Sequence, residues 1–334
     1  MHHSLIEQYE AAKQSAAWID RSYLGQLEVS GKDHVDLLHR ITTNELRHLK
    51  PGQTQITVFT NEKGRIIDRV HLLKFDDRIR LITSRATSAK VANWIEKFIF
   101  IEDVSVSDVS DQYGSISILG PLGHEVVNDL LGTSATTLEE EHFLKTTREH
   151  SEVIVFTGTW AAPPKNLCLI AGANVLPILI NKLLGSTHMP LSNEVYNVLR
   201  IEAGWSEHGK DFDENDNPHE AGMFPYINFD KGCYVGQEVV ARLDTYDKVQ
   251  KHLVGVLLNE EKMPGAKDVI EIDGREAGYI TSSAYSPGLR KNIALGYVRT
   301  KFIRPQAPLT IKSNEGELAG ELVELPFVSM AREI

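Results

Sequence analysis

The chain has 334 residues, of which 42% are hydrophobic and 24% charged, with 24 Gly and 13 Pro spread along it. These values exclude a disordered, collagen-like or low-complexity protein, and the length predicts two or three domains. Lys and Arg number 35 against 46 Asp and Glu, and the net charge of −11 argues against direct binding of nucleic acid or of anionic lipid surfaces.

The cysteine content and the N-terminal composition favour a cytoplasmic protein. Two thiols, Cys168 and Cys233, cannot build a disulfide framework, and they fit a reducing compartment. No signal or transit composition opens the sequence, and no apolar stretch approaches the roughly 20 residues of a membrane span. We expect no metal site, because the sequence has neither Cys-x-x-Cys nor paired histidines with a third ligand.

The first half of the chain predicts strands and helices in two related units. A strand at 23–31 precedes a helix with apolar residues at Val35, Leu38 and Ile41. The β-rich runs at 55–60 and 65–75 flank a turn at 61–64 and predict a hairpin. A comparable order of strands and helices follows, with elements at 78–84, 87–98, 115–120, 121–130, 153–158, 166–172 and up to 184.

Segregated strands and helices with hairpins favour split βαβ, ferredoxin-like sheets over a doubly wound fold. From about residue 250 the sequence changes to short β runs, and Asp273-Gly274 is a strong hairpin signal between two of them. The sequence therefore predicts an α+β protein with two ferredoxin-like modules and a C-terminal antiparallel barrel or sandwich.

Glu202 lies on the apolar face of a predicted helix. Ser192 is a suitable N-cap, and the helix that follows places Val195, Leu199 and Glu202 in one stripe before it ends at Gly204. A buried carboxylate requires donors or a cation. These are either internal groups, such as an arginine or backbone amides, or the N–H donors of a bound ligand.

Asp68 presents the same problem on a strand. Period-two alternation puts it in one row with Ile66, Val70 and Leu72. Either this carboxylate caps a neighbouring turn, or it accepts hydrogen bonds from a bound heterocycle.

The stretch KGCYVGQEVVAR at 231–242 is the most informative in the sequence. It places Cys233 in a glycine-rich loop just before a predicted helix, with Lys231 two residues away. A helix N-terminus and a cation both stabilise a thiolate, so the pattern predicts a reactive cysteine, the alternative being a small buried residue in a turn. Cys168, within an apolar strand, is expected to be part of the core.

Four segments, at 39–46, 61–69, 199–222 and 231–242, resemble the YgfZ-like folate-binding proteins, relatives of the glycine-cleavage T-protein. The resemblance covers nearly the whole chain. It implies two ferredoxin-like modules and a C-terminal β-barrel around a central channel for tetrahydrofolate. We divide the chain into a central folate-binding domain (1–49 with 190–249), a ferredoxin-like α+β domain (50–189) and the barrel domain (250–334).

The resemblance also implies roles for particular residues. Asp68 and Glu202 would meet the pterin of a tetrahydrofolate or one of its one-carbon derivatives, and Cys233 with Lys231 would supply the chemistry. To folate binding we assign in addition Tyr234, Gln237, Glu238 and Arg242. Arg242, more than Lys248 or Lys251, would face the anionic glutamate tail of folate.

The function implied by this subfamily is support of the assembly or repair of iron-sulfur proteins, including tRNA-methylthiolating enzymes. Its partners would be folate and iron-sulfur proteins or their assembly factors. The alternative is a folate-dependent aminomethyltransferase of the T-protein type, and a third possibility is a scaffold without ligand. Arg69 replaces one acid of the aspartate pair of aminomethyltransferases, and Arg65 replaces a glycine, which counts against aminomethyl transfer.

Overall fold

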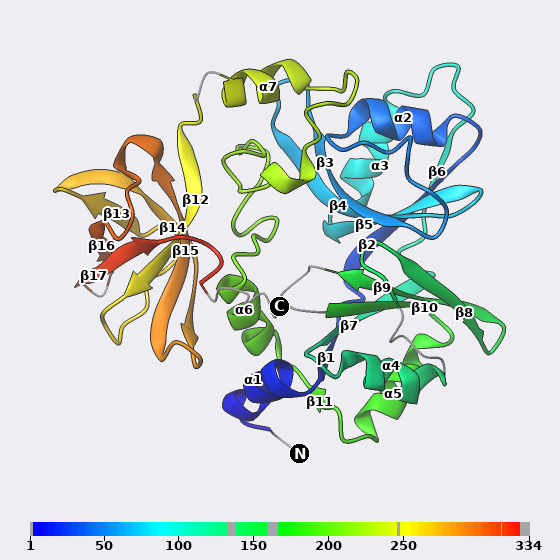
Figure 1. Cartoon of the computed structure of the whole chain (residues 1–334), viewed down its shortest axis with the longest axis horizontal. Helices are drawn as coiled ribbons and strands as arrows, with labels where there is room; N and C mark the ends of the chain where they lie inside the picture. Colours follow the sequence, from blue (N-terminus) through cyan, green and yellow to red (C-terminus); the bar gives the residue numbers. More distant parts are fainter. Residues whose placement is uncertain (1–2, 133–137, 159–165, 246–247, 315, 328–334) are drawn as a thin grey trace.

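Two mainly antiparallel sheets and a closed barrel make up the protein (Figure 1). The computed structural model describes residues 3–132, 138–158, 166–245, 248–314 and 316–327. The sheets lie on one side of helix α6 (Asn193–Glu202) and the six-stranded barrel on the other. The α+β class with a C-terminal antiparallel barrel confirms the fold class predicted from the sequence.

The first sheet has the strand order β3-β4-β5-β2-β6. Helices α2 (His34–Ile41) and α3 (Ser88–Glu96) pack on one of its faces. Every residue of β4 is buried, because this strand has helices on one side and the second sheet on the other. The strands are β2 (Leu24–Ser30), β3 (Thr54–Thr60), β4 (Ile66–Lys74), β5 (Arg78–Arg85) and β6 (Ser105–Asp108).

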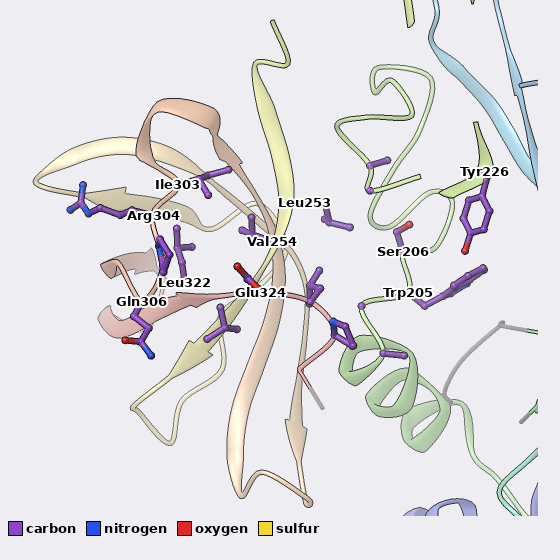
Figure 2. A pocket seen from close by; sticks show the side chains of 18 of the residues that line it. Trp205, Ser206, Tyr226, Leu253, Val254, Ile303, Arg304, Gln306, Leu322 and Glu324 are labelled. Atoms are coloured by element: carbon purple, nitrogen blue, oxygen red, sulfur yellow. The ribbon is translucent and has the colours of Figure 1, made fainter. Parts of the chain in front are cut away.

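The barrel closes in the order β12-β15-β14-β13-β16-β17. Asp273 and Gly274 both have positive φ, 52° and 67°, and form the predicted turn between β13 and β14. Ile201 of α6 packs against the outer surface of the barrel, so that the barrel faces the end of this helix (Figure 2). The strands are β12 (Lys251–Leu258), β13 (Val269–Ile272), β14 (Arg275–Ser286), β15 (Lys291–Arg299), β16 (Pro308–Ser313) and β17 (Gly316–Val323).

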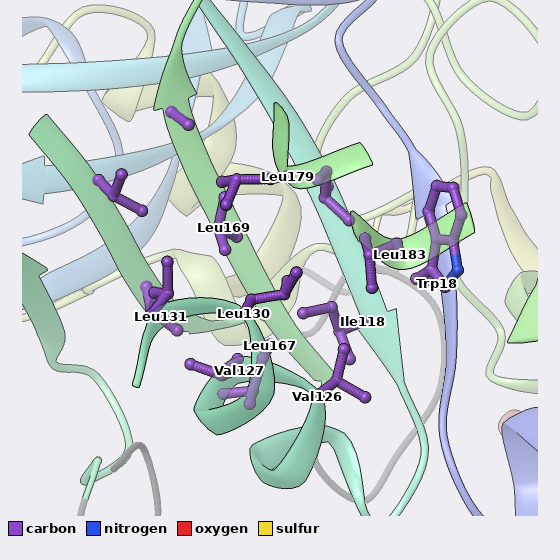
Figure 3. Close-up of a cluster of buried hydrophobic side chains, with 14 of the residues drawn as sticks. Trp18, Ile118, Val126, Val127, Leu130, Leu131, Leu167, Leu169, Leu179 and Leu183 are labelled. Carbon is purple, nitrogen blue, oxygen red and sulfur yellow. The ribbon is translucent and has the colours of Figure 1, made fainter. Parts of the chain in front are cut away.

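The second sheet has the order β11-β1-β7-β10-β9-β8, and α4 (Gly123–Leu131) and α5 (Leu176–Leu184) cover its outer face. Figure 3 shows this core, in which residues of both helices meet alternate residues of the strands. The strands are β1 (Ala17–Asp20), β7 (Tyr113–Leu119), β8 (Phe143–Arg148), β9 (Ser151–Gly158), β10 (Asn166–Gly172) and β11 (Met189–Pro190).

The start of α6 is as predicted, because the Ser192 side chain accepts a hydrogen bond from the backbone N–H of Val195. Helix α1 (Leu5–Gln14), which packs against α6, was not predicted, although Ser4 and Glu7 form a complete capping box at its start. The remaining helical segments are η1 (Phe224–Tyr226), α7 (Gln237–Thr245) and η2 (Thr300–Phe302). Among the described helices, none is both long and apolar enough to cross a membrane.

Strand pairing does not follow the division we expected at residue 49. Strand β2, assigned to the segment 1–49, pairs with β5 and β6 of the segment 50–189. Strand β1 lies in the other sheet, so the chain crosses between the sheets at residues 21–23. The barrel strands, by contrast, all fall within 250–334.

The two sheets pack face to face through an apolar layer. Leu73 and Ile82 of the first sheet meet Ile154 and Ile170 of the second. Cys168 belongs to the same layer, where burial raises the pKa of its thiol to about 11, as expected for a core cysteine. The arrangement is therefore four-layered, with helices outside and the sheets between them.

His71 lies in this layer, with its ring 4.8 Å from the ring of Phe156, and burial lowers its pKa to about 3. The unfolded chain binds a proton near pH 6.5 and the folded one does not, so stability falls as pH decreases from 6.5 toward 3. We predict that this residue alone costs about 2 kcal/mol of unfolding free energy between pH 7 and pH 5.

Urea denaturation at both pH values checks this prediction with His71→Leu, which should lose that pH dependence. The control is His124→Gln at a partly exposed histidine, which should keep it. An equal pH dependence in His71→Leu and the wild type would contradict the prediction.

Candidate functional site

A cavity of about 970 Å³ lies between the barrel and the C-terminal end of α6 (Figure 2). One wall is formed by residues 203–206 and by parts of 221–226. The opposite wall is formed by β12 and β17 and by the segments 303–306 and 322–326. Its volume is at the upper end of the range of about 300–1,000 Å³ typical of small-molecule sites.

The walls combine aromatic faces with a few polar side chains. The rings of Trp205 and Tyr226 are 6.3 Å apart at an interplanar angle of 66°. Ser206 lies on the same wall, and Gln306 and Glu324 on the barrel side (Figure 2). A flat ring system with hydrogen-bonding edges suits such a lining.

Arg69 adds a buried positive charge to the wall. Alternation along β4 places it on the face opposite to Asp68, and it is 8% exposed. Its guanidinium lies 3.6 Å from the ring centre of Trp205 and donates to the backbone carbonyl of Ser206 at 2.6 Å. Burial lowers its pKa, but a guanidinium stays charged at neutral pH. In the described part of the chain, Arg69 has no carboxylate within ion-pair distance.

A second, smaller cavity of about 30 Å³ adjoins the first, because Arg69, Trp205 and Ser206 line both. Three further arginines take part in its lining, namely Arg21, Arg85 and Arg200. The two cavities together form the candidate functional site.

The last turn of α6 fixes the wall between them. Arg200 is 1% exposed, and its Nη1 donates to Asp211 at 2.6 Å and to the carbonyl of Trp205 at 3.2 Å. Its Nη2 donates to the Ser282 hydroxyl of β14 at 2.8 Å. Trp205 is therefore held in place both by the helix and by the barrel.

Glu202 does not line either cavity, which corrects our assignment of it to folate binding. Its Oε1 accepts from the Tyr9 hydroxyl at 2.8 Å and from the Ser286 hydroxyl at 2.6 Å, and Lys13 lies 3.0 Å from Oε2. These partners come from α1 and from the barrel. Internal groups thus meet the carboxylate, the first of our two explanations, with hydrogen bonds to Oε1 and an ion pair at Oε2.

Asp68 is likewise fully buried and is not among the residues that line either cavity, although it contacts Ser84, which lines the small one. It accepts from the backbone N–H of Ser84 at 2.8 Å, from the Ser84 hydroxyl at 2.6 Å and from the Thr87 hydroxyl at 2.7 Å. Its assignment to folate binding is therefore corrected, because the carboxylate caps the turn that precedes α3.

Lys231 is a buried tether and is not directed at either cavity. Its ammonium donates to the carbonyls of His39, Thr42 and Asn44 at 2.6, 2.7 and 2.7 Å. Burial lowers the pKa of Lys231 to about 7, whereas three carbonyl acceptors match the three N–H donors of the charged form. These three hydrogen bonds stabilise the charged form, so Lys231 is a cation that holds residues 39–44.

Cys233 is exposed in the loop before α7, as the reactive alternative requires. Two hydrogen bonds of Val235 fix the loop. Its N–H donates to the backbone carbonyl of Arg40, and its own carbonyl accepts from the Thr60 hydroxyl. Gly236 has φ +85°, and a Cβ there would lie 2.5 Å from the Asn61 carbonyl. The thiol is thus presented at the surface by a fixed loop and remains a predicted reactive group.

The other residues assigned to folate binding also lie outside both cavities. Tyr234 is buried, its N–H donates to Gln237 at 3.3 Å, and burial raises its pKa to about 12. Glu238 and Arg242 form an exposed ion pair with each other on α7. Lys251, considered beside Arg242, pairs with Asp216 at 2.6 Å.

Two aromatic residues that line the site lack a local signal in the sequence. Trp205 directly follows the predicted end of α6, and Tyr226 is one aromatic residue among several. Arg69 was noted only as a departure from a family pattern. The contrast of a basic residue with an apolar strand at Arg69 was as informative as that at Asp68.

Taken together, the fold and the cavity define a protein of two stacked sheets and a barrel with a ligand-sized space between them. Residues 1–162 match the family model of the GCVT N-terminal domain, and residues 251–329 match that of the glycine cleavage T-protein C-terminal barrel domain. These matches at both ends place the chain in the glycine cleavage T-protein superfamily.

Similar proteins agree with this placement. An aminomethyltransferase of Halothermothrix orenii is 26% identical, over 97% of this chain and 92% of the relative. An aminomethyltransferase of Halalkalibacterium halodurans is 25% identical, over 97% and 90%. The crystal structure of glycine cleavage system aminomethyltransferase T from Bartonella henselae has the same fold, with a TM-score of 0.87 at 20% identity, over 97% of this chain and 90% of that one.

We predict that Glu202→Gln lowers the unfolding free energy by about 2 kcal/mol, because it removes a buried charge that joins α1 to the barrel. The loss is measured by urea denaturation. Glu324→Gln, at an exposed carboxylate of the cavity wall, is the control and should change stability by less than about 0.5 kcal/mol. Unchanged stability of Glu202→Gln would refute the role we give this carboxylate.

Proposed function

We propose that the protein binds a tetrahydrofolate in the large cavity and acts on the one-carbon unit that the folate carries. The observation that supports this best is a cavity of about 970 Å³ with two aromatic rings and a buried, unneutralised guanidinium on one wall. Relatives named aminomethyltransferase over 97% of the chain support the same choice.

The residues of the cavity fit a pterin with an anionic tail. Trp205 and Tyr226 offer faces for flat rings, and Glu324, Gln306 and Ser206 offer acceptors for ring N–H groups. Arg69 keeps a positive charge at the same wall. When bound, tetrahydrofolate would supply the nitrogen that carries the one-carbon unit.

Aminomethyl transfer is the activity that we propose first. Asp68, which the resemblance assigned to the pterin, does not serve as its proton acceptor, because its carboxylate is hydrogen-bonded within the turn at 84–87. Arg69 cannot accept a proton at neutral pH. Glu324 is the carboxylate of the main cavity that is free to do so among the described lining residues.

We predict that Trp205→Ala weakens binding of tetrahydrofolate by about 5- to 30-fold, since it removes an aromatic face worth about 1–2 kcal/mol. Calorimetric titration measures the affinity. Trp205→Phe should retain most of it, and Trp94→Ala, at a half-buried tryptophan of α3, should match the wild type. Equal affinities of Trp205→Ala and the wild type would place the folate elsewhere or nowhere.

The activity itself is tested by formation of methylenetetrahydrofolate from an aminomethyl donor. A rate that Glu324→Gln lowers by about 100-fold with unchanged folate affinity would support transfer with Glu324 as the proton acceptor. Folate binding without any product would exclude transfer and leave a folate-binding protein of another kind.

A second function, support of iron-sulfur proteins, is favoured by one specific observation. Cys233 is exposed on a fixed loop, outside the cavities, where a protein partner can reach it. The thiol lies outside the cavity in which we place aminomethyl transfer.

For this second function we predict that Cys233→Ser fails to restore iron-sulfur enzyme activity in a deletion strain. The control is Cys168→Ala at the buried cysteine, which should restore it. Full rescue by Cys233→Ser would exclude a chemical role of the thiol.

A further inference from the structure

Arg21 is a buried arginine at the point where the chain passes from one sheet to the other. It is 3% exposed, and its guanidinium lies 4.1 Å from the ring centre of Tyr196 and 5.1 Å from that of Tyr23. Its Nε and Nη1 have no hydrogen-bond partner among the described residues. A buried guanidinium with two nitrogens that donate to no acceptor is costly unless an acceptor reaches it.

Arg80 provides an internal comparison. It is also fully buried and lies 3.9 Å from the ring centre of a tyrosine, Tyr113. Unlike Arg21, it donates to a carboxylate, that of Glu28, with Nε at 3.2 Å and Nη2 at 2.5 Å. Nη1 of Arg80 also lacks a hydrogen-bond partner, so the difference lies in the charge: a carboxylate neutralises Arg80, and among the described residues none pairs with Arg21.

The unused donors of Arg21 belong to the small cavity beside the folate site. Arg69 and Arg85 line the same cavity, and neither forms an ion pair within the described part of the chain. The carboxylate in this lining, Glu207, is already engaged by Arg200 at 3.2 Å and by Lys210 at 2.9 Å. The cavity thus carries an excess of positive charge in a protein whose net charge is −11.

The shape of this space selects the kind of anion. Its volume of about 30 Å³ is too small for a ring and suits a terminal group. The planar fork of a guanidinium matches the two oxygens of a carboxylate. Because the two cavities share Arg69, Trp205 and Ser206, a ligand in the large one can extend such a group into the small one.

We propose that Arg21, with Arg69 and Arg85, forms a subsite for a carboxylate of the ligand held in the large cavity. This inference rests on the proposed function in one respect: if the ligand is a folate, the carboxylate in the subsite belongs to its glutamate tail. Arg21 is the inner anchor, and Arg85, which is exposed, lies at the outer edge.

The test is calorimetric titration of the full chain with three probes. These are 5-formyltetrahydrofolate, 6-methyltetrahydropterin as the head alone and p-aminobenzoylglutamate as the tail alone. We expect Arg21→Met to weaken binding of the folate and of the tail by about 30-fold and to leave binding of the head unchanged. Arg85→Gln should weaken binding of the tail by about 3-fold.

A melting experiment separates this role from a structural one. Arg21→Met removes an unneutralised buried charge, so its melting temperature should equal or exceed that of the wild type. Arg80→Met, the matched control, should melt at a lower temperature and bind all three probes as the wild type does. A decrease for Arg21→Met as large as that for Arg80→Met would overturn the proposal.

The outcomes also separate this proposal from the folate proposal. Equal folate affinity of Arg21→Met and the wild type overturns the subsite alone. Failure of both the folate and the head to bind the wild type overturns the folate proposal. In that case the subsite is still supported if p-aminobenzoylglutamate binds and Arg21→Met weakens its binding. If p-aminobenzoylglutamate does not bind either, the subsite proposal is overturned too.

Discussion

The burial of two opposite charges in the last turn of α6 is the constraint on which the site depends. Arg200 is 1% exposed and Glu202 is 2% exposed. Each contacts one hydroxyl of the barrel strand β14: Arg200 donates to Ser282, and Glu202 accepts from Ser286. A buried charge with one partner removed is strongly destabilising, so these contacts leave little freedom to the barrel. The large cavity lies next to Trp205, between the barrel and the end of α6. Its walls are held in place because Arg200 bonds both to the carbonyl of Trp205 and to Ser282 of the barrel.

The same principle recurs at other buried charges. Asp68 fixes the turn before α3, and Lys231 holds the carbonyls of residues 39–44. In each case the charged group joins two segments of the chain through hydrogen bonds. Hydrogen bonds are directional and fix how the segments lie relative to each other, whereas apolar contacts are not directional. At these two positions the buried charge holds loops in place and does not face a ligand.

Sequence patterns identified the local structure well and the partners of buried groups poorly. The cap at Ser192 and the turn at Asp273 could be predicted because their determinants lie within a few residues. The burial of Glu202 could be predicted too, but its partner Tyr9 is 193 residues away in the sequence. Periodicity reports that a side chain is buried and carries no information on what it meets, so it left open the choice between a ligand and the tyrosine, serine and lysine found here.

Recognition of an anionic ligand by an acidic protein has to be short-ranged. At physiological ionic strength the screening length is about 8 Å, so the overall charge of −11 hinders approach only weakly once a ligand enters a cavity. Within the cavity, buried guanidinium groups act in a medium of low polarity, where each interaction is stronger than at the surface. Arg69 and Arg21 can therefore dominate binding although the protein as a whole repels anions.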